Sequence, residues 1–276
     1  MIIQKSDDAT AFNKFELQGW ENNSTGYDQH FGPITQQSVK PTLDAVILRK
    51  GMRVLDVCTG PGMLASSAAV RGADAIGLDF SEEAINIARR NVPGADFQQG
   101  DAQSLPFDDN SFDAVVCGFG IIHVPSPEAA LKEMIRVLRT GGSMAISVWD
   151  VPDPSNGFGI FYEAAKLYGD MTVPLPHGPD FFQFSTDDAM TTALATIGLK
   201  DISVTRAEQF FETPDAAGLM QAIAEGTVRA SGLLRAQTAE ARAAIYAKAA
   251  ENVEAYNTAD GTYRIPMPAV IGSGRK

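Results

Sequence analysis

The sequence predicts an α/β fold in which a parallel sheet is covered by helices on both faces. Between about residues 35 and 149, short apolar runs typical of strands alternate with segments that have helical periodicity. Each segment between two strands is long enough for a crossover helix, and such crossovers are almost always right-handed. Repeated units of this kind form a doubly wound parallel sheet.

The strands expected in this region are short and apolar, as strands buried on both faces are. They cover residues 54–57, 75–79, 96–99, 112–117 and 143–148. The helices between them have recognisable ends. Ser81 is placed as a cap before two glutamates, whose charge favours a helix start, and Gly72 is placed as a stop.

The second half is predicted to be mainly helical, with further strands at residues 202–211 and 263–271. Helices are expected near residues 160–168 and 186–197, and over most of residues 215–256. The two prolines of the last strand favour the edge of a sheet or a bulge. Because the helices of this half interrupt the strand pattern, we expect them to form a cap.

Composition limits the class of protein. The chain has 276 residues, 45% of them hydrophobic, which is enough for one large α/β domain or a core with a smaller appendage. The formal net charge of −12 argues against nucleic acid and anionic membranes as partners, since both are negatively charged.

The cysteines and the N-terminus bear on the compartment. Cys58 and Cys117, the two cysteines, each end a predicted strand, which suits buried thiols of a reducing compartment better than a disulfide framework. The start, MIIQKSDDAT, has no basic region followed by an apolar run, and no segment approaches the roughly 18 apolar residues of a membrane span. We expect a soluble cytoplasmic protein.

The turn after the first predicted strand reads VLDVCTGPGML. Its GPGMLA segment matches G-x-G-x-x-A, one form of the dinucleotide-binding fingerprint. Glycine lets a ligand approach the backbone, and the following helix start offers free N–H groups. The pattern alone is weak evidence, because it suits several adenosine-containing ligands.

Asp56, which precedes this turn, separates two such ligands. A dinucleotide would place a pyrophosphate over the turn, where the carboxylate would repel it. S-adenosylmethionine has no phosphate and carries a sulfonium and an ammonium. The Coulomb energy between unit charges about 4 Å apart is a few kcal/mol at an effective dielectric near 20. Its sign favours S-adenosylmethionine, and we find no Tyr-x-x-x-Lys pair of a nicotinamide enzyme at the fourth or fifth strand.

Acids also follow the next two strands. Asp79 ends the second strand, where an acid can accept hydrogen bonds from both ribose hydroxyls of an adenosine ligand. It would serve a dinucleotide equally, or be simply an exposed acid before a helix cap. Asp101 follows the third strand and could accept from the adenine amino group.

Four stretches in order, VLDVCTGPG, GLDFS, GDAQSLPFDDNSFD and LKEMIRVLRTGG, resemble the successive motifs of class I S-adenosylmethionine-dependent methyltransferases. The resemblance to the ubiquinone/menaquinone-biosynthesis C-methyltransferase type runs from about residue 51 to residue 149. It implies a Rossmann-like, doubly wound, seven-stranded and mostly parallel sheet with helical cap insertions. It also implies S-adenosyl-L-methionine as cofactor and a small-molecule methyl acceptor.

The resemblance also implies which residues bind the cofactor. They are Asp56, Thr59, Gly60 and Gly62 around the methionine part, Asp79 at the ribose, Phe80, Asp101 and Ala102 at the adenine, and Gly118 and Phe119 near the methyl group. In related enzymes a tyrosine in a stretch such as WENNSTGYDQHFGP folds over the cofactor, which points to Tyr27. Its ring could attract the sulfonium by about 0.5 to 2 kcal/mol, although simple helix packing explains it equally well.

Two positions depart from the family pattern. Cys58 stands where the family often has glycine, and cysteine is small enough to replace it. GFGIIHV resembles a GxRNV-like stretch of the quinone enzymes, but has Ile122-His123 in place of Arg-Asn. The second departure weighs against a quinone acceptor and leaves the methyltransferase prediction unchanged.

Methyl transfer has no obligatory catalytic residue, because positioning alone can contribute roughly 7 to 11 kcal/mol. A base is needed only if the acceptor must lose a proton. His123 follows the fourth strand and is the candidate base, with a loop-fixing bond to backbone near Ser126 as the alternative. Aromatic residues of the second half could line a substrate cavity, although such residues are commonly core. The candidate substrate residues are Trp149, Phe158, Tyr162 and His177.

These predictions combine into one hypothesis. Residues 1–34 form an N-terminal lid, residues 35–150 the cofactor-binding core, and residues 151–276 the rest of the sheet with a helical cap at about 215–257. The protein methylates an apolar or aromatic small molecule on oxygen or carbon, without a metal. Two alternatives stay open, a protein that binds the cofactor without methyl transfer and a nicotinamide-dependent oxidoreductase. The sequence leaves the oligomeric state open.

Overall fold

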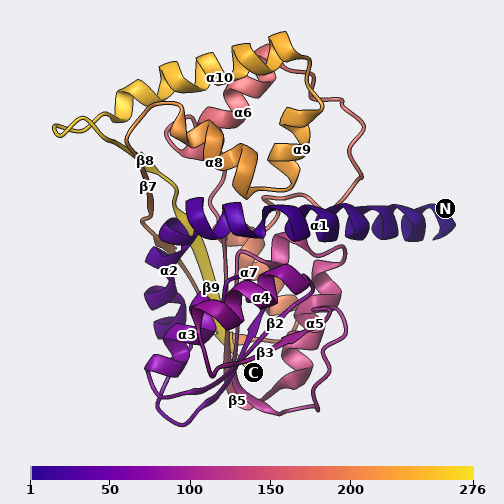
Figure 1. Cartoon of the computed structure of the whole chain (residues 1–276). Helices are drawn as coiled ribbons and strands as arrows, with labels where there is room; N and C mark the ends of the chain where they lie inside the picture. Colours follow the sequence, from indigo (N-terminus) through magenta and orange to yellow (C-terminus); the bar gives the residue numbers. More distant parts are fainter. Residues whose placement is uncertain (1) are drawn as a thin grey trace.

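The computed structural model describes residues 2–276, with side chains from residue 8 onward. Met1 and the side chains of residues 2–7, within the stretch predicted to lack a secretory signal, lie outside the described part. A long helix, α1 (Ile2–His30), crosses the molecule between a sheet-containing core and an upper group of helices (Figure 1).

The core is built on a seven-stranded sheet in the order β3-β2-β1-β4-β5-β9-β6. Its strands are β1 (Arg53–Val57), β2 (Asp74–Asp79), β3 (Asp96–Gln99), β4 (Phe112–Gly118), β5 (Leu138–Trp149), β6 (Lys200–Ala207) and β9 (Ala269–Arg275). Neighbours among β1 to β5 run parallel, whereas β9 is antiparallel to both β5 and β6. The predicted doubly wound, seven-stranded and mostly parallel sheet is confirmed.

Helices cover both faces of this sheet. One face packs against α2 (Gly32–Ala45), α3 (Met63–Val70) and α4 (Glu82–Asn91), and the other against α5 (Pro127–Val137) and α7 (Asp187–Thr196). A hydrophobic cluster lies on each face of the sheet. Along β1, Val54 belongs to the cluster on the side of α3 and α4, and Leu55 to the cluster on the side of α5 and α7. Burial on both faces explains why the strands read as apolar runs and not as alternating sequences.

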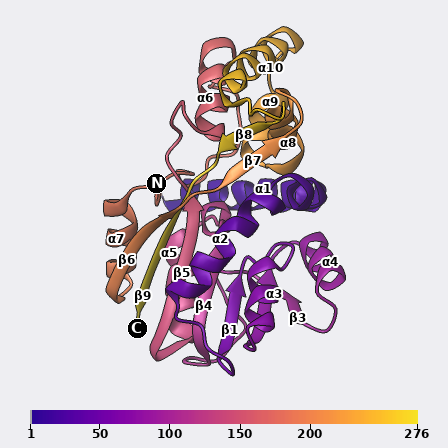
Figure 2. The same ribbon diagram turned by 90° about the vertical axis from the view of Figure 1, so that its left-hand side faces the viewer.

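The upper group of helices forms what we call the cap. It consists of α6 (Gly157–Tyr168), α8 (Gly218–Gly226), α9 (Arg229–Arg235) and α10 (Ala239–Val253) (Figures 1 and 2). Ile245, Ala249 and Val253 of α10 are buried, as their shared helix face predicts. Tyr256, predicted on the same face, is only partly buried, because the chain has entered the 3₁₀ turn η2 (Glu254–Tyr256).

Two predicted strands are each divided in the structure. The run at residues 202–211 gives β6 and then β7 (Phe210–Thr213), and the run at residues 263–271 gives β8 (Tyr263–Pro266) and then β9. β7 and β8 pair with each other in a small sheet that connects the core to the cap (Figure 2).

The predicted edge position of the closing strand is correct for β8, which belongs to a two-stranded sheet, and wrong for β9. β9 lies inside the sheet, between β5 and β6. Pro266 ends β8, where it is opposite Phe210, and Pro268 lies between β8 and β9, so neither missing N–H group falls within the seven-stranded ladder.

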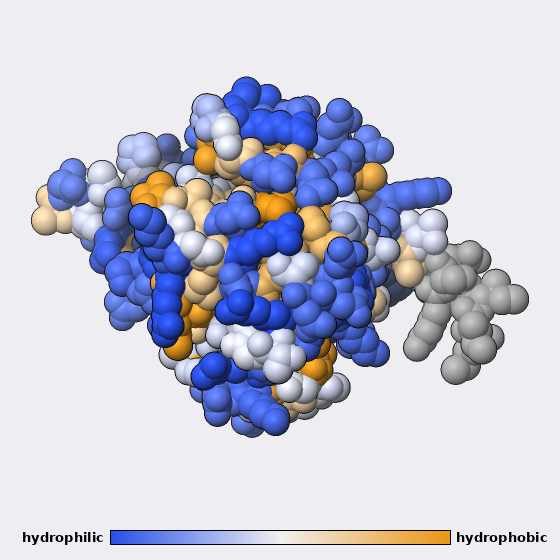
Figure 3. Space-filling model, turned by 90° about the horizontal axis from the view of Figure 1, so that it is seen from below, coloured by the Kyte–Doolittle hydropathy of each residue, from blue (hydrophilic) through white to orange (hydrophobic). Residues whose placement is uncertain are grey.

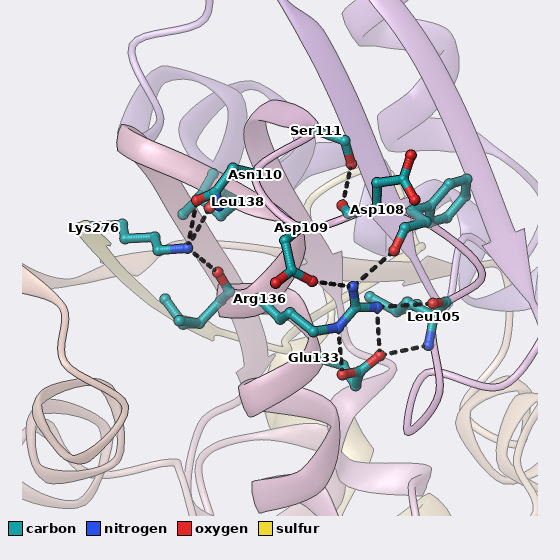
Figure 4. Close-up of polar contacts among 11 residues, drawn as sticks. Leu105, Asp108, Asp109, Asn110, Ser111, Glu133, Arg136, Leu138 and Lys276 are labelled. Atoms are coloured by element: carbon teal, nitrogen blue, oxygen red, sulfur yellow. Dashed lines mark hydrogen bonds and ion pairs between the residues drawn. The ribbon is translucent and has the colours of Figure 1, made fainter.

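Arg136 of α5 fixes the loop that leads from β3 to β4. Its guanidinium donates to the carbonyls of Leu105 and Phe107, and pairs with Glu133 and Asp109 (Figure 4). Because this loop starts just beyond the third strand, the network holds the path of the chain close to the predicted adenine-binding residues.

The face opposite the cap is largely hydrophilic, with apolar side chains scattered over it (Figure 3). This distribution agrees with the high charge of the chain. Within the part of the chain that the structure describes, no helix combines the length and the hydropathy that crossing a membrane requires.

Candidate functional site

A large cavity lies at the carboxyl ends of the parallel strands, where β1 is flanked by β2 and β4. The strand order runs from β1 to β2 and β3 on one side and from β1 to β4 and β5 on the other. In open α/β sheets, ligands bind at such a reversal of strand order. Its wall is formed by the loops after β1 to β4, the end of β5 and residues of α1, α2, α3 and α4. About 1160 Å³ of empty space lies within and around it, including space open to solvent.

The structure brings nearly all the predicted cofactor residues to this cavity. Those that form its wall are Tyr27, Asp56, Thr59, Gly60, Asp79, Phe80, Asp101, Ala102, Gly118 and Phe119. Gly62 does not line the cavity. It adopts a φ of +88°, and a Cβ there would lie 2.8 Å from the Phe97 ring, so this glycine serves the packing of α3 on the sheet.

Asp56 is buried at the end of β1 and has one carboxylate oxygen without a partner. Its Oδ2 accepts from Thr59 Oγ1 at 2.6 Å and from the Ala65 amide at 3.0 Å. Its Oδ1 is buried and has no hydrogen-bond partner. Burial raises the pKa of Asp56 to about 7, and the neighbouring Asp79 adds to the shift. An unpaired buried acceptor costs about 1–3 kcal/mol, so this oxygen suits a ligand that brings a cation or a donor.

Asp79 is buried and fixed by two backbone groups. Its Oδ2 accepts from the Gly60 amide at 2.9 Å, and its Oδ1 accepts from the Ser81 amide at 3.0 Å. The carboxylate thus connects the glycine loop to the start of α4. Burial raises the pKa of Asp79, and these hydrogen bonds oppose the rise. Each oxygen keeps a second lone pair that could accept from a hydroxyl.

Two non-glycine residues on the cavity wall adopt left-handed backbone. Cys58, after β1, has a φ of +56°, and Phe119, after β4, has a φ of +59°. This conformation costs an L-residue roughly 1–2 kcal/mol and glycine almost nothing. The geometry therefore gives a physical reason why a glycine would suit the position of Cys58. Cys58 and Cys117 are both free thiols.

Asp101, which also lines the cavity, forms hydrogen bonds with Gln103. Its Oδ1 accepts from the Gln103 amide at 2.8 Å and from the Gln103 side chain at 3.1 Å. Gln103 in turn accepts from the Ser126 amide at 3.1 Å. Gln103 itself lines the cavity, and the sequence pattern did not identify it.

His123 lies in the 3₁₀ turn η1 (Ile121–His123) and lines the cavity. Its Nδ1 is 2.9 Å from Oε2 of Glu16, on α1. The alternative prediction, a bond from this histidine to backbone near Ser126, is wrong, since its partner is a buried carboxylate 107 positions earlier in the chain.

α1 and α2 contribute two stripes of side chains to the wall. From α1 these are Asn13, Trp20, Ser24 and Tyr27, and from α2 they are Thr35, Ser38, Val39 and Thr42. The Tyr27 ring stacks on Phe31 at 5.8 Å and meets Trp20 edge-on at 5.3 Å. Burial raises the pKa of Tyr27 well above its ordinary value. Helical spacing is the signal that could have identified these stripes.

The predicted substrate residues divide into three groups. Trp149 lines the cavity, with its ring centre 4.3 Å from that of Phe119 and 5.2 Å from that of Phe158. Phe158 and Tyr162 lie behind it among the aromatic rings of the cap, outside the cavity wall. His177 is exposed on the loop before α7 and does not line the cavity.

Ser147 is a cavity residue that sequence reasoning missed. It lies on β5, and its Oγ is buried without a hydrogen-bond partner. A single hydroxyl within the apolar run MAISVW was the available signal. In the described residues, no cluster of three or more His, Cys, Asp or Glu side chains could hold a metal ion.

Comparisons with known proteins agree with this geometry. A family model described as a methyltransferase domain matches residues 55–146. The demethylmenaquinone methyltransferase of Renibacterium salmoninarum is 44% identical over 110 residues, which is 40% of this chain and 46% of that protein. The protein of the same name from Staphylococcus carnosus is 36% identical over 166 residues, which is 56% of this chain and 67% of that protein. The match to these relatives thus spans between about half and two thirds of their length.

A solved structure shares the fold. The crystal structure of the YcgJ protein from Bacillus subtilis aligns with a TM-score of 0.56 at 20% identity, covering 87% of this chain and 97% of that chain. The Asp56 oxygen without a hydrogen-bond partner, together with Asp79 and Asp101 on the cavity wall, suits the positively charged groups of S-adenosylmethionine. The chain therefore belongs to the class I S-adenosylmethionine-dependent methyltransferases, of the demethylmenaquinone methyltransferase type, and its cofactor is S-adenosylmethionine.

Proposed function

We propose that the protein transfers a methyl group from S-adenosylmethionine to a carbon or oxygen atom of an apolar, aromatic small molecule. The observation that carries this proposal is the buried, unpartnered Oδ1 of Asp56 on the cavity wall. A phosphate-bearing cofactor would add negative charge beside a carboxylate in a low-dielectric site, whereas an ammonium would supply the missing partner.

The residues of the core suit the parts of this cofactor. Asp56 would accept from the ammonium, and Asp79, held by the glycine loop, would accept from the ribose hydroxyls. Phe80 would pack on the adenine, and Asp101 and Ala102 would meet its edge. When bound, S-adenosylmethionine supplies a methyl group that is attached to a sulfonium. The sulfonium becomes a neutral thioether when the methyl group is transferred.

We propose α1 as the lid of this site. Trp20, Ser24 and Tyr27 of α1 line the cavity, so this helix would cover one side of a ligand bound there. Residues 1–34 would then act as the lid, residues 35–150 as the cofactor core, and the rest of the chain as the remaining strands and the cap.

The acceptor we propose is a phenol or hydroquinone. Aromatic rings of Phe119 and Trp149 lie on the cavity wall, which suits a flat apolar ring. The named relatives act, by their names, on demethylmenaquinone. A quinone ring is electron-poor, but its hydroquinone becomes nucleophilic at carbon and oxygen once a hydroxyl proton is lost. His123, which replaces the asparagine of the quinone-enzyme pattern, could take that proton.

Two measurements test the proposal. Isothermal titration with S-adenosylhomocysteine is expected to give one site per chain, and no binding at high protein concentration would remove the cofactor assignment. Methyl transfer from labelled S-adenosylmethionine to a short-chain reduced demethylmenaquinone, and to simple phenols, is expected to label the acceptor. Tight binding of the cofactor product without any labelled acceptor would favour a binding protein over a transferase.

A further inference from the structure

Beside the cavity, three charged side chains from distant parts of the chain form one buried cluster. Glu16 comes from α1, His123 from η1 and Arg229 from α9. Glu16 is completely buried, and the side chains of His123 and Arg229 are 15% and 17% exposed. Of the three, only His123 lines the cavity, and Glu16 also contacts Trp20, a second residue of the cavity wall.

Both carboxylate oxygens of Glu16 have partners. Its Oε1 accepts from Arg229 Nε at 2.8 Å, and its Oε2 accepts from Trp20 Nε1 at 3.2 Å and contacts His123 Nδ1 at 2.9 Å. Burial by itself raises the pKa of Glu16, but the interactions with His123 and Arg229 outweigh burial and hold the pKa below its usual range. An ionised carboxylate can only accept, so the proton in this contact lies on Nδ1.

Arg229 balances this charge and fixes the turn that carries the histidine. Its guanidinium donates to the carbonyl of Ile122 at 2.6 Å and to that of Pro179 at 2.7 Å. It also lies over the Phe12 ring, 4.5 Å from the centre. The arginine thus holds the backbone of η1 while Glu16 holds the ring of the residue that follows Ile122.

We propose that Glu16 is the positioning residue for His123, holding the imidazole as the Nδ1–H tautomer so that Nε2 receives the proton of the acceptor. This inference rests on the proposed methyl transfer. As the acceptor atom forms its bond to the methyl carbon, the carbon–sulfur bond breaks with its electron pair going to sulfur, and the acceptor hydroxyl proton goes to Nε2. The positive charge then on the imidazole faces Glu16, with Arg229 on α9 and Asp79 at the end of β2 as the other charged groups near it.

A surface pair provides a matched control. His30 Nε2 lies 2.8 Å from Oε2 of Glu225, and this pair also joins α1 to a cap helix. Glu225 is half exposed and outside the cavity wall. Removing the charge of Glu225 breaks a histidine–carboxylate contact of the same kind and leaves the cavity unchanged.

The first test leaves Glu16, His123 and Arg229 unchanged. The chain has three histidines, so nitrogen-15 NMR of histidine-labelled protein can be assigned with His30→Asn and His177→Asn. In wild type, neutral His123 is expected to have a protonated Nδ1 and an unprotonated Nε2, with S-adenosylhomocysteine bound or absent. The opposite tautomer would overturn the proposal, whatever the activity of the protein.

The second test separates positioning from binding. In Glu16→Gln, we expect kcat with reduced short-chain demethylmenaquinone to fall at least tenfold, and the dissociation constant of S-adenosylhomocysteine to change less than threefold. The His123 signals should show a mixture of tautomers, and Glu225→Gln should match wild type in every respect. Wild-type turnover in a folded Glu16→Gln protein would overturn the inference, and if that variant does not fold, the wild-type tautomer decides. A wild-type protein with the Nδ1–H tautomer but no methyl transfer would instead contradict the proposed function.

Discussion

The core and the cap side of this molecule contribute to one cavity in different ways. On the core side, Asp56, Asp79 and Asp101 lie at or just beyond the ends of three parallel strands and meet at one edge of the sheet. On the cap side, Glu16 and Arg229 are 213 positions apart, and they meet only because α1 is packed between the sheet and the cap.

This difference separates residues whose position follows from the sequence pattern from residues whose position depends on tertiary packing. Parallel strands end at a common edge, so an acid after each strand is brought to the site by topology alone. A long helix has many faces and many possible neighbours, and nothing in its own sequence says which residue it will meet. We expect core variants to change cofactor affinity and cap-side variants to change turnover, and the following predictions test that division in order of expected effect on affinity.

Asp79→Ala should have the largest effect on the cofactor side. It removes the proposed ribose acceptor and leaves the amides of Gly60 and Ser81 without their partner. We expect the affinity for S-adenosylhomocysteine to fall at least about a hundredfold, or about 2.7 kcal/mol, in isothermal titration. Asp74→Ala, at the exposed opposite end of β2, is the matched control and should bind normally. An equal loss of affinity in Asp79→Ala and Asp74→Ala would contradict the assignment of Asp79 to the cofactor site.

A pH titration sharpens the role of Asp56. Since burial raises its pKa to about 7, the ligand-free protein holds a proton on this group below that pH. A cationic ligand prefers the ionised form, so binding must release the proton, and affinity falls by up to about tenfold per pH unit below 7.

We therefore expect S-adenosylhomocysteine to bind about twentyfold more weakly near pH 5.5 than near pH 7.5. Asp56→Asn should bind more weakly at neutral pH and lose this dependence. An unchanged pH dependence in that variant would assign the titration to another group and contradict the proposed contact.

Trp149→Leu tests a residue that lies between the core side and the cap side of the cavity. Its ring packs on Phe119 and faces the cavity from the end of β5, where we place the acceptor. We expect kcat/KM for the aromatic acceptor to fall about tenfold, because the platform for a flat ring is lost, while cofactor affinity changes less than about threefold. Trp149→Phe keeps an aromatic face and should recover most of the activity. A loss of cofactor affinity larger than the loss of turnover would place this residue on the cofactor side.

Arg136→Gln should affect stability and leave cofactor affinity unchanged. The variant removes hydrogen bonds to Leu105 and Phe107, which lie outside the cavity wall. We expect the free energy of unfolding in urea to fall by about 1–3 kcal/mol, since two carbonyls lose charged donors. Arg90→Gln, which breaks an exposed pair with Glu83, should cost less than about 1 kcal/mol.

The fold was predictable where strands and helices alternate, because each apolar run is buried on both faces and each helix has its own caps. Ser81 caps α4 by accepting from the Ala84 amide, as its sequence position indicates. The division of the last strands was not predictable to the same degree. Pro266 and Pro268 indicate that a break is present, but the position of β9 inside the sheet depends on pairing with β5 and β6.

The candidate site was predictable on the same terms. Strand-end residues such as Asp56 and Gly118 line the cavity, because their place follows from topology. Gly62 and His177 do not line it, since a glycine in a loop can serve packing and a loop histidine can point to solvent. Their chemistry was suitable, but their direction depends on the tertiary structure.

The sequence by itself determined the parallel sheet, its family and the row of acids at its edge, because strand periodicity and chain order are local properties that topology converts into position. Only the tertiary structure decided which oxygen of Asp56 lacks a partner and which carboxylate faces His123. The first depends on how the turn after β1 folds back onto Asp56. The second depends on the packing of α1 and α9 against the core, and contacts between such distant segments leave no trace in the local pattern.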